Sequence, residues 1–190
     1  MDIFLIGIIS YLMGSIPFGY ILTKIFLKKD IREIGSGNIG ATNALRAGNK
    51  SIGYFTLALD ILKAIIPVVY VKIFYQDFLY IASLCAFLGH VFPIWLKFKG
   101  GKGVATGFGV ILSLNLNIGI VALLIWVLIA KLFKISSMSA LIAYFLIPVL
   151  MFYYETQIIY FLSSFLISLV CFVQHRENIK RLINRSEPKI

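Results

Sequence analysis

Long apolar runs separated by short basic segments constrain this chain more than any other feature. Of its 190 residues, 60% are hydrophobic and only 14% are charged, and the mean hydropathy is +0.94. Soluble domains average about 45–50% apolar and about 25% charged residues, so this excess cannot be buried in one small globule and must face lipid. The sequence predicts an all-α, polytopic bundle of membrane helices that forms one integral membrane domain over residues 1–190.

A membrane-spanning helix needs about 20 predominantly apolar residues, and five runs come close to that length. They are Ile3–Leu27, Ile52–Tyr75, Phe78–Phe98, Ser137–Tyr154 and Ile158–Val173. The remaining apolar stretch is too long for one upright span, and Asn115 and Asn117 interrupt it. We divide it into Val104–Leu116 and Ile118–Ala130, which gives seven predicted transmembrane helices.

The net charge of +10 gathers on one side of this predicted topology. The basic side holds Lys28, Lys29, Arg32, Arg46, Lys50, Lys97, Lys99, Lys102, Lys131, Lys134, Arg176, Lys180, Arg181, Arg185 and Lys189. The other side holds Asp2, Gln76, Asp77, Asn115, Asn117 and Glu155. The positive-inside rule then places the basic side and the C-terminus in the cytoplasm and the N-terminus outside. Because orientation explains the charge, nucleic acid is not expected as a partner.

A glycine-rich segment follows the first predicted span. It combines three glycines with four polar residues: Gly35, Ser36, Gly37, Asn38, Gly40, Asn43 and Arg46. Glycine allows positive φ and close approach to a ligand, and successive N–H groups in such a turn form a nest for anions. Arg46 can bind phosphate or carboxylate through two parallel hydrogen bonds. The alternative is a tight loop at the membrane surface, but this density of polar residues favours an anion site.

A second glycine-rich segment directly precedes the predicted helix that begins at Val104. It reads Lys99, Gly100, Gly101, Lys102 and Gly103. A helix N-terminus offers N–H groups and the positive end of its dipole to phosphate, and the lysines add charge. The glycine spacing of a Walker loop is absent. The alternative is a basic turn that anchors a helix in the membrane surface, and we favour contact between Lys102 and phosphate.

Asp60, Lys63 and His90 fall well inside predicted spans, where polar residues are costly unless they face a cavity or a partner. His90 either lines a substrate cavity or makes a hydrogen bond between helices. Asp60 and Lys63 lie three residues apart, so they share one helical face. An ion pair that faces the bundle interior is the arrangement with the lowest cost in free energy. It is either purely structural or places Lys63 at the floor of a substrate cavity.

A third polar motif leaves the last predicted span at His175. If the helix continues, His175, Asn178 and Arg181 share a face because they recur at three-residue steps. Basic residues beside a membrane helix usually contact lipid headgroups, but His175 with Asn178 is more specific. Histidine is the side chain best suited to act as a general base near neutral pH.

In this order and at these separations, the motifs resemble those of the bacterial glycerol-3-phosphate acyltransferases that use acyl-phosphate, the PlsY family. The resemblance covers nearly the whole chain and includes Gly14–Gly19 and Asp60–Lys63. It implies a seven-helix enzyme of the bacterial inner membrane whose active site opens to the cytoplasm. Its substrates would be acyl-phosphate and glycerol 3-phosphate, its surroundings membrane lipid, and its functional form a monomer.

The resemblance also implies roles for individual residues. Important residues of the first and third family motifs correspond to Ser36, Arg46, His175, Asn178 and Glu187. Glycines that the family uses for glycerol 3-phosphate correspond to Gly100, Gly101 and Gly103. Two positions depart from the family pattern, because Ala64 and Arg185 stand where the family often has glycine.

The two substrates suggest direct transfer, in which a hydroxyl of glycerol 3-phosphate attacks the acyl carbonyl and inorganic phosphate leaves. The products would be lysophosphatidic acid and phosphate, as in the first acylation step of phospholipid synthesis. Either His175 or a phosphate oxygen of a substrate would act as the base. Cys85 and Cys171 lie in apolar runs, and no residues have metal-ligand spacing, so neither a metal nor another cofactor is expected.

The alternative function is that of a membrane transporter for an organic phosphate anion, which would also use basic residues and broken helices. Such a transporter usually has a central path open to both faces, often between internal repeats. The predicted polar motifs instead gather on one face, and this favours an enzyme at the membrane interface.

Overall fold

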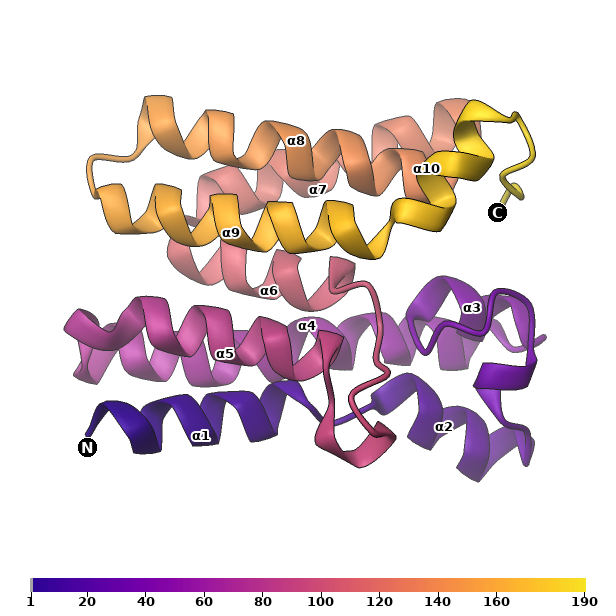
Figure 1. Cartoon of the computed structure of the whole chain (residues 1–190), viewed down its shortest axis with the longest axis horizontal. Helices are drawn as coiled ribbons and strands as arrows, with labels where there is room; N and C mark the ends of the chain where they lie inside the picture. The colour runs from indigo at the N-terminus through magenta and orange to yellow at the C-terminus, as the bar shows by residue number, and fades with distance from the viewer. Residues whose placement is uncertain (1) are drawn as a thin grey trace. The chain divides into compact units, whose positions relative to one another are not determined.

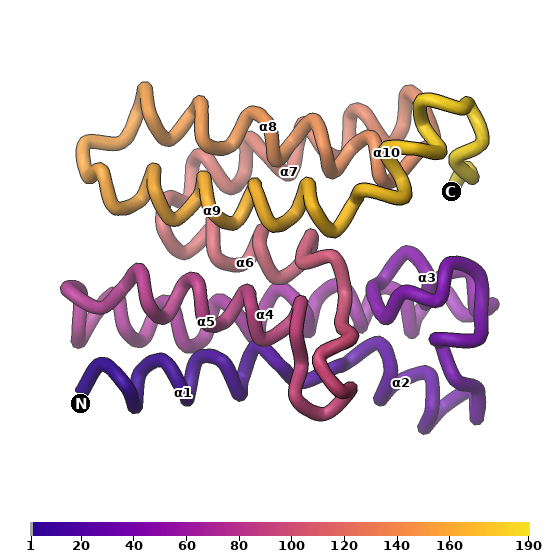
Figure 2. The backbone as a smooth tube through the Cα atoms, viewed as in Figure 1, coloured from indigo at the N-terminus to yellow at the C-terminus, as the bar shows by residue number. Residues whose placement is uncertain are grey.

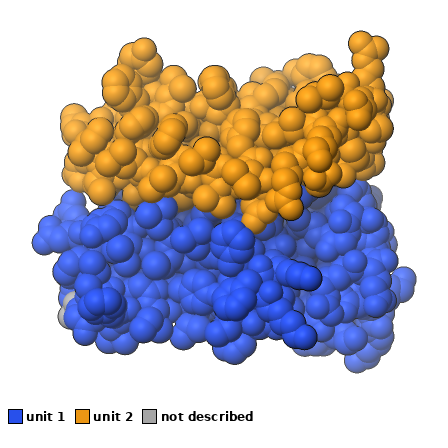
Figure 3. Space-filling view, viewed as in Figure 1, with its two compact units in different colours: residues 1–113 blue, residues 114–190 orange. Residues whose placement is uncertain are grey.

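The computed structural model describes residues 2–190, and none of these residues forms a strand. The chain divides into two compact units, residues 1–113 and 114–190, which Figure 3 shows in blue and orange. The prediction of an all-α protein is therefore confirmed for the described part of the chain. Each unit has its own polar residues.

Unit 1 is a bundle with irregular segments at one end (Figure 1). Its elements are α1 (Ile3–Gly14), α2 (Phe18–Leu27), η1 (Ile31–Glu33), α3 (Ala41–Arg46), α4 (Lys50–Phe74), η2 (Gln76–Phe78), α5 (Leu79–Val91), η3 (Ile94–Leu96) and α6 (Val104–Leu114). Helices α1, α4 and α5 pack against one another. The Tyr11 hydroxyl of α1 donates to the Phe92 carbonyl, 2.6 Å away, just after α5.

The first predicted span is interrupted between α1 and α2 at residues 15–17. Pro17 has no N–H, and its ring disfavours a helical conformation at Ile16. The break leaves the Ile16 carbonyl outside the helical ladder, where it accepts a hydrogen bond from Lys63 at 2.7 Å. The interruption therefore creates a polar contact in the interior of unit 1.

Unit 2 consists of α7 (Leu116–Phe133), α8 (Ser136–Tyr154), α9 (Ile158–Gln174) and α10 (Arg176–Ile183). Helix α8 packs against both α7 and α9. The predicted apolar stretch is indeed interrupted, but at Asn115 and not at Asn117, which lies inside α7. Asn115 caps α7, and its Oδ1 accepts from the Ile118 N–H at 3.0 Å. At His175 the chain bends by 61° between α9 and α10 (Figure 2), so the last helix does not continue straight.

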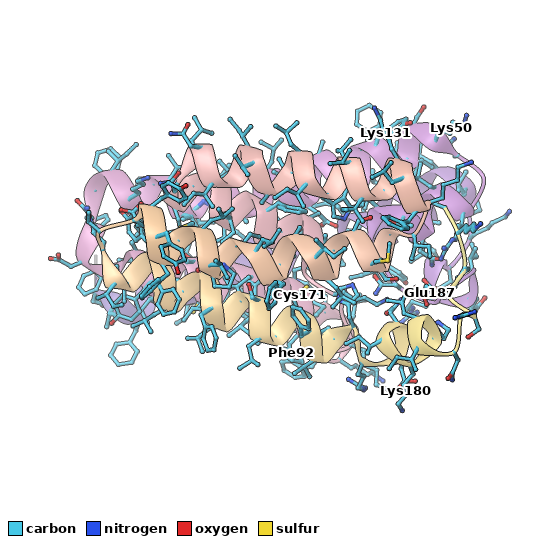
Figure 4. All side chains as sticks on the ribbon, turned by 90° about the horizontal axis from the view of Figure 1, so that it is seen from above. Lys50, Phe92, Lys131, Cys171, Lys180 and Glu187 are labelled. Carbon is cyan, nitrogen blue, oxygen red and sulfur yellow. The ribbon has the colours of Figure 1, made fainter. Side chains whose placement is uncertain are left out.

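The two ends of unit 2 differ in chemistry. At one end, Asn115 Nδ2 donates to the Glu155 carboxylate at 3.0 Å. At the other, the Ile190 N–H donates to the Lys134 carbonyl at 2.8 Å. Figure 4 shows Lys131, Lys180 and Glu187 at one end of the helices of this unit. This separation within unit 2 agrees with the predicted distribution of charge.

Four helical segments are long and apolar enough to cross a membrane, and a bent fifth segment joins α9 and α10. The four are Ile3–Leu27, Gln76–Leu96, Leu116–Phe133 and Ser136–Tyr154. Helix α6 is apolar but has only 11 residues, and α4 contains the charged pair Asp60 and Lys63. The structure thus supports four or five spans on length and composition, and seven spans remain a prediction.

One lysine falls outside the predicted charge pattern. Lys72, in the last turn of α4, donates to the Ser113 carbonyl at 2.7 Å. That carbonyl lies at the C-terminal end of α6, where the helix dipole favours a positive charge. The charge count from the sequence omits this residue, and the contact supplies a structural reason for a lysine at that end of unit 1.

Arg185 stands where the resemblance suggests glycine, and its φ is +55°. This left-handed conformation costs a residue with a Cβ about 1–2 kcal/mol but costs glycine little. Arg185→Gly is therefore expected to stabilise the protein by about 1 kcal/mol in detergent, measured by thermal unfolding. The matched control is Lys180→Gly within α10, which should destabilise by about 1 kcal/mol. A lower melting temperature for Arg185→Gly would contradict this account of the turn.

Candidate active site

The first glycine-rich segment folds around the side chain of Asn43, which is 2% exposed. Its amide nitrogen donates to the carbonyls of Ile31, Ile34 and Asn38, at 3.0, 2.8 and 2.9 Å. Its Oδ1 accepts from the Ser36 N–H at 3.0 Å. Asn43 therefore holds the loop together, and its predicted contact with a substrate phosphate remains a prediction.

Ser36 lies at the exposed tip of this loop between two left-handed glycines. Gly35 and Gly37 have φ of +54° and +70°, which glycine adopts without strain. The Ser36 hydroxyl has no hydrogen-bond partner among residues 2–190 and can meet a ligand. A Cβ on Gly35 would lie 3.5 Å from Cδ of Arg46, so the Arg46 side chain passes beside the same loop. The Asn38 side chain accepts from the Gly40 N–H at 2.9 Å and closes the turn into α3.

The two arginines of this segment have different surroundings. Arg32 forms an ion pair with Asp30, with Nη2 and Oδ2 2.6 Å apart. The hydrogen bond from Arg32 lowers the pKa of Asp30 to about 2. Arg32 is thus engaged with a neighbouring carboxylate, and the contact of Arg46 with a substrate anion remains a prediction.

The second glycine-rich segment is tied to the first through a small apolar core. Leu96 of η3 belongs to the same cluster as four buried residues of the first segment and its flanks: Ile31, Ile39, Ala44 and Ile52. The N–H groups of Gly100 and Gly101 donate to the carbonyls of Val91 and His90, both at 3.1 Å. A phosphate at this loop would therefore bind other groups than these two N–H groups, and the predicted contacts of Lys99, Lys102 and Gly103 remain predictions.

Asp60, Lys63 and His90 form one buried cluster, with exposures of 1%, 4% and 3%. The Lys63 ammonium lies 2.8 Å from Asp60 Oδ1 and 3.0 Å from His90 Nδ1. The Ile16 carbonyl also accepts a hydrogen bond from Lys63, at 2.7 Å. The pair faces the interior of unit 1, as predicted. The contact with His90 joins α4 to α5, which is the helix–helix alternative predicted for that histidine.

In unit 2, His175 lies at the bend between α9 and α10 and is 2% exposed. Its Nδ1 lies 2.8 Å from the Cys171 carbonyl. Because a carbonyl can only accept, Nδ1 carries the proton, and in the neutral ring the lone pair is on Nε2. This tautomer, with an unprotonated Nε2, is the form that a general base needs.

Glu187 connects the C-terminal segment to α8 and α10 through hydrogen bonds. Its Oε1 accepts from Ser137 Oγ at 2.7 Å and from Asn178 Nδ2 at 2.5 Å. Its Oε2 accepts from Arg181 Nε at 2.6 Å. Asn178 and Arg181 thus do share a face of α10, as predicted. The sequence gives no signal for Ser137, which lies fifty residues before Glu187.

Burial alone would raise the pKa of Glu187, but the hydrogen bonds from Ser137, Asn178 and Arg181 outweigh it and lower the pKa. A lowered pKa in the folded state means that Glu187 stabilises the protein above its ordinary pKa of 4.5 and loses this effect as pH falls below it. Glu187→Gln is expected to destabilise by about 1.5–3 kcal/mol at pH 7, because charged hydrogen bonds are lost.

Thermal unfolding at pH 7 and pH 4 measures this effect. The difference between wild type and Glu187→Gln should shrink at the lower pH. Glu177→Gln is the matched control, since Glu177 makes only exposed contacts with Arg176 and Lys180. Equal stability of the Glu187→Gln variant and the wild-type protein at pH 7 would contradict the supporting role of Glu187.

The residues predicted for the site fall in both units. Ser36, Arg46 and Lys102 belong to unit 1, whereas His175 and Asn178 belong to unit 2. Their convergence in one site remains a prediction. Among residues 2–190, no group of three or more histidine, cysteine, aspartate or glutamate side chains is arranged to hold a metal ion.

The fold and the polar loops define a class: a helical membrane protein with side chains suited to phosphate. The family described as glycerol-3-phosphate acyltransferase matches residues 4–185. A glycerol-3-phosphate acyltransferase of Pelagibacter ubique is 56% identical over 190 residues, covering 100% of this chain and 98% of the relative. One from Dinoroseobacter shibae is 46% identical, covering 98% and 92%. The chain belongs to the glycerol-3-phosphate acyltransferase family.

Solved structures agree with this assignment. The crystal structure of PlsY (YgiH), an integral membrane glycerol 3-phosphate acyltransferase, in its glycerol 3-phosphate form is 35% identical and superposes with a TM-score of 0.93. Its lysophosphatidic acid form is 34% identical, with a TM-score of 0.91. Both comparisons cover 99% of this chain and 95% of the other. The protein is thus a PlsY-family member, which confirms the resemblance found in the sequence.

Proposed function

We propose that this protein transfers an acyl chain from acyl-phosphate to glycerol 3-phosphate and releases lysophosphatidic acid and inorganic phosphate. The observation that carries the proposal is the family match over residues 4–185. The exposed Ser36 hydroxyl beside the Arg46 side chain supports it locally, because the two groups suit an anionic substrate. Glycerol 3-phosphate is the substrate in the names of its relatives.

The proposed topology has seven spans in a bacterial inner membrane, with the N-terminus outside and the C-terminus in the cytoplasm. The active site then faces the cytoplasm within one domain, and the protein acts as a monomer. Two observations support this arrangement. Helices α6 and α7 are separate, with a capped break at Asn115. Lysines and arginines collect at one end of unit 2, opposite Glu155.

The substrates can be assigned to the polar groups by their charge. Glycerol 3-phosphate would bind Lys102 and Arg46, with Lys99 and the turn at Gly103 contributing positive potential. Acyl-phosphate would contact Ser36 and Asn38, with its tail among the apolar helices. Lys63 does not fit a direct phosphate contact, because its ammonium group is buried, is paired with the Asp60 carboxylate and is bound to the Ile16 carbonyl and His90.

The chemistry needs little beyond positioning and charge stabilisation, because acyl-phosphate is a mixed anhydride with a good leaving group. A hydroxyl oxygen of glycerol 3-phosphate forms a bond to the acyl carbon. The bond between that carbon and the phosphate oxygen breaks, and phosphate leaves with the electron pair. The hydroxyl proton passes either to Nε2 of His175 or to a phosphate oxygen of a substrate. Asn178 would act beside His175.

Purified protein in lipid vesicles tests this function. With acyl-phosphate and labelled glycerol 3-phosphate, we expect labelled lysophosphatidic acid and phosphate in equal amounts. Ser36→Ala should lower this turnover by about 100-fold, the scale seen when one transition-state donor is removed. The matched control Ser186→Ala, at an exposed serine of the C-terminal segment, should not. Entry of the label without chemistry would indicate a transporter. Product formation from acyl-CoA but not from acyl-phosphate would contradict the proposed donor.

A further inference from the structure

The buried cluster in unit 1 fixes the tautomer of His90. Its Nδ1 lies 3.0 Å from the Lys63 ammonium nitrogen. An ammonium group can only donate hydrogen bonds, so Nδ1 must accept and cannot carry a proton. The proton of the imidazole ring is therefore on Nε2.

Asp60 keeps the lysine in its donating form. Its carboxylate lies 2.8 Å from Lys63 Nζ, and both side chains are almost fully buried. The distance from Asp60 to His90 Nδ1 is 3.7 Å, too long for a hydrogen bond. Asp60 thus makes no hydrogen bond to His90, and the Asp60–Lys63 pair leaves the imidazole with one donor on its far side.

The Nε2–H group is directed at the second glycine-rich segment. A Cβ on Gly101 would overlap Nε2 of His90, so only glycine, which has no Cβ, leaves room for the imidazole ring at this position. Among residues 2–190, no group accepts a hydrogen bond from Nε2. His90 is 3% exposed, so its Nε2–H is free to donate to an acceptor from outside the protein, at a loop whose neighbour Lys102 is positively charged.

We propose that Nε2–H of His90 donates a hydrogen bond to an oxygen of a phosphorylated substrate at the glycine loop. His90 is then a substrate-binding residue, and Asp60 and Lys63 are positioning residues that act through it. The inference rests on the proposed function, because that function supplies the two candidate substrates. Glycerol 3-phosphate and acyl-phosphate offer the same chemistry, an anionic or hydroxyl oxygen, and water is the competing acceptor.

The chain contains only two histidines, which makes a direct test possible. Protein labelled with ¹⁵N-histidine, with His175→Asn used to assign the signals, reports the tautomer of His90. We expect a protonated Nε2 and an unprotonated Nδ1 without substrate. The Nε2 signal should then shift on addition of either glycerol 3-phosphate or a non-hydrolysable acyl-phosphonate, and the one that shifts it is the ligand. A proton on Nδ1 overturns the inference, as does an Nε2 signal that neither compound shifts.

Two substitutions separate binding from folding. The amide of His90→Gln can reach the position of Nε2 and donate there, whereas the shorter amide of His90→Asn reaches only the position of Nδ1. We expect His90→Asn to raise the KM for one substrate about 10-fold or more relative to His90→Gln, with a smaller change in kcat. Thermal unfolding of both variants identifies any loss of fold. Equal KM values in two folded variants would overturn the inference.

These experiments distinguish the inference from the proposed function. If wild-type protein makes no lysophosphatidic acid from acyl-phosphate, the proposed function fails. If wild-type protein turns over while the Nε2 signal stays unchanged, only the inference about His90 fails.

Discussion

Lys63→Met is expected to destabilise the protein by about 3–5 kcal/mol, the usual result of removing one partner from a buried ion pair. The Asp60 carboxylate is 1% exposed and would lose the ammonium that compensates its charge. The Ile16 carbonyl and His90 Nδ1 would also lose their donor. Unfolding in detergent, followed by the loss of helical signal against temperature or denaturant, measures the effect.

The matched control removes both charges. In Asp60→Leu/Lys63→Met no buried charge is left unpaired, so most of the lost stability should return. The double variant should nevertheless have impaired turnover, because nothing then fixes the tautomer of His90. A single variant as stable as wild type would show that Asp60 and Lys63 do not form a buried pair. A stable double variant with full activity would show that the pair is purely structural.

Gly101→Ala should abolish most of the activity, with a loss of about 100-fold or more. The new Cβ would overlap the His90 ring at Nε2, and the ring cannot easily retreat because Nδ1 is bound to Lys63. The loop must move instead, and displacement of a binding group by about 1 Å can cost about 10²-fold in rate. Overpacking should also lower stability by about 1–3 kcal/mol.

Gly7→Ala is the control for this substitution. A Cβ on Gly7 would lie 3.3 Å from Cγ2 of Ile81, a contact that a small shift relieves, and it is far in sequence from the polar loops. We expect near-normal turnover from Gly7→Ala, measured in the same vesicles. Normal turnover by Gly101→Ala would show that the close contact between the loop and His90 is not needed for activity.

The features predicted correctly from sequence depend on local chemistry. The break at Asn115 follows from a residue type that caps helices, and the pairing of Asp60 with Lys63 follows from their spacing on one helix. The ends of the helices were less predictable. The break before Pro17 divides the predicted span Ile3–Leu27 into two helices, and α7 extends to Phe133, beyond the predicted end at Ala130. No proline or glycine marks the bend at His175, so the sequence leaves open whether the helix continues there, and in the structure it bends by 61°.

Contacts between residues that are distant in the sequence could not be predicted. Glycine and asparagine patterns identify the first loop as a candidate anion site, but they do not reveal that Asn43 binds the loop's own carbonyls. The hydrogen bond of Ser137 with Glu187 depends on how the C-terminal segment folds back on α8. The same limit applies to the contacts of Lys63 with Ile16 and His90, which belong to other segments of the chain. Only tertiary structure brings such partners together.

If residues of both units act on one pair of substrates, the Ser36 loop and the His175 bend lie on the same face of the membrane. Single cysteines in a variant without Cys85 and Cys171 test this directly, at the exposed positions Ser36→Cys, Arg185→Cys and Gln157→Cys. In intact spheroplasts, a membrane-impermeant maleimide should label only Gln157→Cys, and the other two should react after permeabilisation. Labelling of Ser36→Cys and Arg185→Cys from opposite faces would contradict a shared site.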